Sequence, residues 1–260
     1  GTTVFLNAIP SSNYVFDSWS GDATGTLANT SVSMWGNKTV TANFVRPIGY
    51  IAQNGVTVKA YSSAKVGDTG QINGDTYTVV DLEMLRAMIS EEKDISKAIT
   101  TFITDMSYLF RSSRFNGDIS SWDVSNVKDM NHMFDFSEFN GDISNWDVSN
   151  VTNMYYLFNA SKFNGDISNW DVSNVVNMGA MFSCFNFGGT NPFNGDISSW
   201  DVSKVTNMFG IFHLSKFNGD ISKWDVSNVT NFAYSFMQSE FTGDLSSWDV
   251  SKATSMRKMF

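Results

Sequence analysis

The most suggestive chemical feature of the sequence is a row of aspartates at fixed spacing. Each follows a tryptophan in the tetrapeptide Trp-Asp-Val-Ser, and successive copies lie 24 residues apart, with one step of 30. The aspartates are Asp123, Asp147, Asp171, Asp201, Asp225 and Asp249. If they stand on adjacent strands, their carboxylates lie roughly 5 Å apart, and like charges directly opposed destabilise a sheet. Something must therefore compensate this row of charge.

Three kinds of compensation are open. Calcium takes several oxygens from carboxylates, carbonyls and water, and it is the one candidate cofactor. A basic or hydroxylated ligand on the acidic strip is a second solution. The third is local, because an Asp can accept hydrogen bonds from the Ser two residues on or from backbone N–H groups of the next turn. No Asp-x-Asp-x-Asp-Gly loop occurs, so a dedicated calcium cage of the EF-hand kind is not expected.

A second candidate ligand-binding site lies in the insertion that makes the 30-residue step. Six extra residues fall within 183–192, a stretch rich in Gly, Asn and Pro, which predicts a loop. Loops on rigid scaffolds often carry function, so Phe185 and Phe187 are candidate exposed contact residues. The alternative is that these two rings plug the gap that the insertion creates.

The sequence contains few of the residues and motifs that catalysis requires. The single cysteine, Cys184, shares no partner pattern with His132 or His213. The sequence has no Gly-x-Ser-x-Gly, phosphate-binding glycine loop or His-Glu-x-x-His motif. Abundant Asp leaves a glycoside-hydrolysing carboxylate pair open, but such a pair needs unlike environments that separate two pKa values, and these aspartates repeat. We predict no catalytic residues and a protein that is not an enzyme.

The elements that position these residues follow from an internal repeat. The unit reads Phe-Asn-Gly-Asp-Ile-Ser-x-Trp-Asp-Val-Ser-x-Val-Thr-Asn-Met-x-x-x-Phe. Ile119, Trp122 and Val124 have the spacing of a leucine-rich-repeat strand, while Met130 and Phe134 predict a short helical turn facing inward. Such units bury a core only when stacked. The predicted fold class is therefore α+β: a leucine-rich-repeat-like solenoid of about seven turns, each with one short strand and one short helical turn, preceded by a small β-rich module.

Three domains are expected. Residues 1–46 form the small β module, because short runs of β-forming residues alternate with Pro, Gly, Asn and Ser. Residues 47–93 form a connector with hairpin turns at Asn54-Gly55 and Asn73-Gly74, and its short helix, with Asp81 as N-cap, caps the solenoid. Residues 94–260 form the repeat solenoid, in which 94–105 is a degenerate first turn.

Charge and composition exclude several classes of protein. The net charge of −9 disfavours nucleic-acid binding through phosphate neutralisation. One cysteine excludes an internal disulfide framework and a cysteine-ligated structural zinc. No run approaches the roughly 18 apolar residues of a membrane span, so we expect a soluble chain without membrane insertion. Residues 1–20 lack the basic-then-apolar pattern of an export signal, which was either removed or never there.

The repeat resembles the BspA-like leucine-rich-repeat surface proteins of bacteria, in the branch with the Trp-Asp-Val-Ser unit, as in Phe139–Met154. The stretches Tyr14–Asp22 and Gly36–Phe44 resemble the divergent internalin-type B repeat. These resemblances imply a fragment of a larger secreted or surface protein, located outside the cell or at its surface, that works in adhesion or recognition. They imply no catalytic residues and no uniform ligand.

The leading hypothesis is a non-catalytic extracellular recognition or adhesion module that binds through its repeated polar strand face. Its partner would be a protein or glycan on a host, a neighbouring cell or the matrix, and the module itself would be monomeric. Many weak, repeated contacts would supply the affinity. A structural spacer that projects another domain is the alternative, and a carbohydrate-binding module is a weaker one.

Overall fold

The N-terminal part of the chain is a pair of two-stranded antiparallel sheets. We describe a computed structural model, which covers residues 1–11, 14–185 and 189–260. The strands are β1 (Thr2–Asn7), β2 (Val15–Gly21), β3 (Asn29–Met34) and β4 (Val40–Val45). β1 pairs with β3 and β2 pairs with β4, around a small core that includes Trp19 and Val32. The β-rich character expected of this segment is confirmed.

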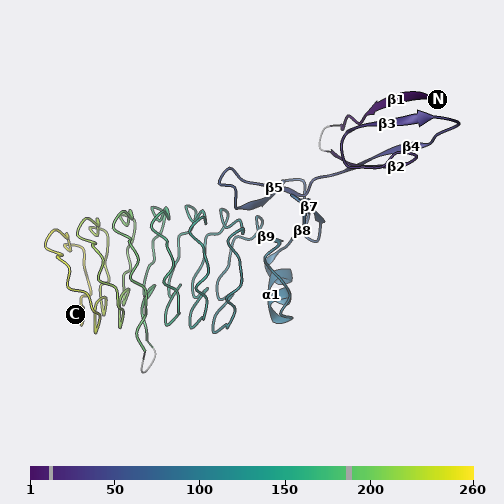
Figure 1. Ribbon diagram of the computed structural model, residues 1–260. Helices are drawn as coiled ribbons and strands as arrows, with labels where there is room; N and C mark the ends of the chain where they lie inside the picture. The colour runs from purple at the N-terminus through teal and green to yellow at the C-terminus, as the bar shows by residue number, and fades with distance from the viewer. Residues whose placement is uncertain (12–13, 186–188) are drawn as a thin grey trace.

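The next segment contains two hairpins and the helix. Its elements are β5 (Gly49–Ile51), β6 (Val58–Ala60), β7 (Thr69–Ile72), β8 (Asp75–Val79), α1 (Leu82–Ser90) and β9 (Ala98–Ile99). β5 pairs with β6, and β7 pairs with β8, so both predicted hairpins are confirmed; β9 adds to β8 in parallel. Asp81 caps α1 as expected, because its carboxylate accepts a hydrogen bond from the Met84 N–H at 2.8 Å. Figure 1 places these elements between the N-terminal sheets and the repeats.

In the repeat region, residues 94–260, equivalent side chains of successive units stack on one another. The Trp122 and Trp146 rings are nearly parallel with centroids 6.4 Å apart, and Phe139 and Phe163 repeat that geometry at 6.4 Å. Each indole N–H donates to a carbonyl of the preceding unit, as Trp146 does to Ile119 at 3.1 Å. One continuous hydrophobic core results, and Figure 1 shows the units as a row of similar loops.

Backbone hydrogen bonds join each unit to the next. The amides of Met130, His132 and Phe134 donate to carbonyls 23 residues further on, at 2.9–3.0 Å. One residue per unit forms a parallel bridge with its equivalent. These bridges link Asp105, Asp129, Asn153, Asn177, Asn207, Asn231 and Ser255 in succession. The chain therefore rises by one unit at a time in a constant register.

The predicted α+β, leucine-rich-repeat-like solenoid is wrong. In the part of the chain that the structure describes, α1 is the only α-helix, and the units contain β-turns and single bridges in place of a strand and a helical turn. The described part of the chain is nearly all β, with small sheets and one helix. It contains no helix, among the described residues, that is long and apolar enough to cross a membrane.

Two features of the backbone explain the error. His132 and Phe136 have φ of 54° and 56°, a left-handed conformation that interrupts a right-handed helix. Alternate amides also bond to the next unit, so they are not available to carbonyls four residues back. Where a strand was expected, the Trp122 N–H bonds to the Ile119 carbonyl at 3.2 Å and closes a turn. Met130 and Phe134 still point inward, because both are fully buried.

Replacing a buried tryptophan should strongly destabilise the repeats. Trp170 is 3% exposed and its indole N–H donates to the Ile143 carbonyl at 3.1 Å. We predict that Trp170→Ala lowers the free energy of unfolding by about 3–5 kcal/mol in urea denaturation, because it leaves a large cavity. Asn169→Ala, at the exposed neighbouring position, should change it by less than about 0.5 kcal/mol. A loss below about 1 kcal/mol for Trp170→Ala would contradict this packing.

Candidate binding surfaces

Five of the six predicted aspartates form an exposed row along the repeats. Each carboxylate Oδ1 accepts a hydrogen bond from the backbone N–H of the serine two residues on, at 2.9–3.2 Å. The local hydrogen bond considered from the sequence is thus present. We call this set the acidic row: Asp147, Asp171, Asp201, Asp225 and Asp249.

Asp123, the sixth aspartate, is only 1% exposed. Lys59 of β6 lies 3.3 Å from its Oδ1, and the Thr101 hydroxyl donates to its Oδ2 at 2.7 Å. The Val58 N–H also donates to the Ser121 carbonyl at 2.8 Å, so β6 covers this unit. Asp123 stabilises the contact between β6 and the repeats and is inaccessible to a ligand. The repeat pattern contains no sign of this long-range contact.

Hydrogen bonding favours the ionised form of four members of the acidic row. The side chain and backbone N–H of Ser173 hold the pKa of Asp171 below its ordinary value of 3.8. The serines two residues on lower the pKa values of Asp201, Asp225 and Asp249 in the same way. Repulsion from Asp201 and Asp249 opposes this at Asp225, but it is the smaller effect there. These four aspartates therefore present a regular series of negative charges at neutral pH.

The acidic row is not a preformed metal cage. Among the described residues, no group of three or more His, Cys, Asp and Glu is placed to hold a metal ion. Each row carboxylate already accepts a serine N–H through Oδ1, so a calcium ion there would need most of its oxygens from water or from a partner. Calcium binding stays an untested prediction.

A second surface of the repeats, which the sequence did not reveal, is a series of neighbouring aromatic rings, in which three of the five successive pairs are stacked. Tyr108 and His132 lie 4.8 Å apart, His132 and Tyr156 4.7 Å, and Phe185 and Phe209 5.6 Å between centroids. We call this set the aromatic column: Tyr108, His132, Tyr156, Phe185, Phe209 and Tyr234. The 24-residue spacing of Tyr108, His132 and Tyr156 was the available signal, but these positions vary between units.

The insertion supplies one ring of the aromatic column. Gly210 and Ala180 occupy the position that is Tyr156 in the unit before them and Tyr234 in the unit after them, and a Cβ on Gly210 would meet the Phe185 ring at 2.7 Å. Phe185 is half-buried and also stacks on His213 at 4.2 Å, so it fills the gap left by small residues. Burial lowers the pKa of His213, which keeps its imidazole neutral. Phe187, the other predicted contact residue, lies outside the described residues.

A buried carboxylate organises the first end of the aromatic column. Asp135 is 1% exposed; it accepts the Arg111 Nε–H at 3.0 Å and an Asn159 amide N–H at 2.7 Å, and His132 Nδ1 lies 2.9 Å away. The Arg111 guanidinium lies 5.7 Å from the Tyr108 ring centroid. At the other end, Arg257 lies 5.8 Å from the centroid of Tyr234. An arginine thus flanks each end of the column.

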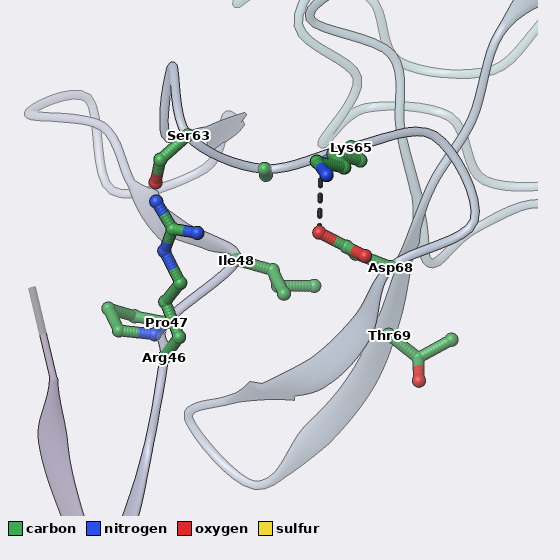
Figure 2. A pocket seen from close by; sticks show the side chains of 8 residues that line it. Arg46, Pro47, Ile48, Ser63, Lys65, Asp68 and Thr69 are labelled. Carbon is green, nitrogen blue, oxygen red and sulfur yellow. Dashed lines mark hydrogen bonds between the residues drawn. The ribbon is translucent and has the colours of Figure 1, made fainter.

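A polar pocket of about 360 Å³ lies outside the repeats, between Arg46–Ile48 and the loop that precedes β7 (Figure 2). Asp68 accepts the Lys65 backbone N–H at 2.8 Å, so this carboxylate closes its own loop. The lining residues include neither histidine nor cysteine.

Comparisons with known proteins identify two families along the chain. Residues 81–186 and 184–260 match the family described as "Mycoplasma protein of unknown function, DUF285", and residues 1–47 match the divergent InlB B-repeat domain. No curated protein and no solved structure matches the chain. Both are surface-repeat families and neither is described as an enzyme, so the matches indicate a repeat module of a bacterial surface protein. The expected relationship is confirmed at that level; its leucine-rich-repeat character is not.

The serine bonds of the acidic row should be visible in a titration. We predict that Ser173→Ala raises the pKa of Asp171 toward 3.8, measured by NMR, because it removes the largest cause of the lowering. A lowered folded-state pKa stabilises the native state above the unfolded value, and this contribution is lost as the pH falls through the folded value. Ser173→Ala should therefore lower the melting temperature at about pH 6 but not at about pH 2.

Ser168→Ala is the matched control, since Ser168 bonds Asp166 in the same unit. It should raise the pKa of Asp166 and leave that of Asp171 unchanged. An Asp171 pKa that is the same with and without the Ser173 hydroxyl would contradict this account.

Proposed function

We propose, from the premise that this chain belongs to the DUF285 family, that it is a non-catalytic recognition module of a bacterial surface protein. The observation that carries the proposal is the acidic row, whose carboxylates are exposed, ionised and fixed in orientation by their serines. Its partner is a protein or glycan with basic or hydroxyl groups, on a host, a neighbouring cell or the matrix.

The fixed orientation of the row carboxylates favours a role in binding a partner over a role in solubility alone. A side chain that is already ordered loses less conformational entropy when a partner binds. The backbone under the row is held by the stacked core, in which Trp170 and Trp200 are almost completely buried. Repeated carboxylates can engage several partner groups at once, so weak single contacts add to useful avidity.

A rigid spacer is the second candidate. It is favoured by the continuous core, which runs without interruption from α1 to Met259. The two functions differ in one respect: a spacer needs no binding by the chain itself. Carbohydrate recognition by stacking on tryptophan is less well supported, because five of the six repeat indoles, Trp122 and Trp170 among them, are buried and the sixth, Trp248, is partly buried.

Removing charge from the middle of the acidic row should abolish recognition. We predict that Asp171→Asn with Asp201→Asn weakens binding to whole cells or immobilised matrix proteins at least about tenfold, while the melting temperature changes little. The matched control is Asp166→Asn with Asp196→Asn, which removes the same charge from the same two units. These carboxylates are also exposed and bonded to the serine two residues on.

The control should bind within about twofold of the unchanged protein. An equal loss of binding in both double variants would show that binding depends on net charge and not on the position of the acidic row. Absence of binding by the unchanged chain to every surface offered would overturn recognition in favour of the spacer.

A further inference from the structure

At the first end of the aromatic column the rings stack face to face. Tyr108, His132 and Tyr156 are stacked within 15° of parallel, so both faces of the His132 ring are covered by its neighbours and its edge is the accessible part. Tyr108 is 48% exposed, and the other members are partly exposed. A sugar ring cannot stack on a covered face. Aromatic edges carry partial positive charge, and they attract carboxylate and carbonyl oxygens.

Cationic groups stand at both ends of this series of edges. The Arg111 side chain is 49% exposed; its Nε–H is bonded to Asp135, which holds the guanidinium beside Tyr108. Arg257 is exposed beside Tyr234. Although the whole chain has a net charge of −9, the side chains at the two ends of this surface are arginines. Charge complementarity therefore favours an acidic partner here.

We propose that the aromatic column, with Arg111 and Arg257, is the docking surface for an acidic, extended segment of a partner protein. Tyr, Phe, His and Arg make up the surface, and Tyr and Arg are enriched among residues that dominate protein–protein binding energy. Five steps separate the unit of Tyr108 from that of Tyr234, which at about 4.8 Å a step gives roughly 24 Å. An extended segment of about seven residues spans that length.

The segment's carboxylates pair with the two guanidinium groups, and its apolar side chains contact the ring edges between them. Arg111 and Arg257 fix the ends of the segment, while Asp135 acts as a positioning residue that keeps Arg111 in place. This surface is separate from the acidic row, so either site can fail its test without affecting the other.

The probe is a synthetic peptide of about ten residues in which Glu and Leu alternate, with Gln and Lys versions of the same length as controls. Isothermal titration calorimetry on the full chain should show binding of the Glu peptide, weaker binding of the Gln peptide and none of the Lys peptide. The affinity for the Glu peptide should fall as salt rises, because charges at the rim of an interface are screened. Equal affinity for the Glu and Gln peptides would overturn the proposal.

Arg111→Gln with Arg257→Gln should weaken binding of the Glu peptide at least about tenfold. The control, Arg114→Gln with Lys223→Gln, removes the same charge at exposed positions outside the column and should stay within about twofold. Arg257→Gln alone should weaken binding severalfold. Because Arg257 is far from the buried Asp135, this single variant shows the effect on binding even if the double variant is destabilised by the loss of Arg111. If the double variant binds as tightly as the unchanged chain, the column is not the docking surface.

Sedimentation equilibrium tests whether a second copy of this chain occupies the aromatic column instead of a partner protein. A chain that stays monomeric at micromolar concentration supports a heterologous acidic segment. Self-association that Arg111→Gln with Arg257→Gln abolishes would show that the acidic row of a second copy fills the column, and would overturn the proposal.

Discussion

The structure depends on hydrogen bonds that run from each unit to the next, with backbone amides donating to carbonyls one unit further on. A single unit contains too few apolar residues to bury its own core, so these bonds and the stacked rings must form together. Phe134, for example, donates to the Leu157 carbonyl at 3.0 Å and its ring lies 5.6 Å from Phe158. The same register is kept across the insertion, where Phe182 stacks on Phe212 at 5.9 Å.

Because the register is constant, the side chains at equivalent positions of successive units form a line along the molecule. Exposed aspartates become a charged row, and aromatic residues at the surface become a column of neighbouring rings. Both proposed binding surfaces are lines of this kind, and each is interrupted at one place. Asp123, covered by β6, and Phe185, contributed by the insertion, are two such interruptions.

The sequence was sufficient to identify the repeat, its core positions, the hairpins and the helix cap at Asp81. It was not sufficient for the conformation within a unit. Met130 and Phe134 are spaced as on a helix, yet a left-handed residue between them, His132, brings the same side chains inward through turns. The aromatic column was missed because Phe185 reaches it from outside the repeat pattern, and the burial of Asp123 was missed because β6 lies more than 60 residues earlier.

Amide hydrogen exchange is the most direct test of the bonds between units. The amides to follow are those that donate to the next unit: Phe110, Phe134, Phe158, Phe182 and Phe212. The account predicts that all five exchange slowly, with protection close to the global free energy of unfolding, because they open only when the stack does. Exchange of these amides as fast as that of exposed loop residues would contradict the stacked structure and the two proposed binding surfaces that depend on it.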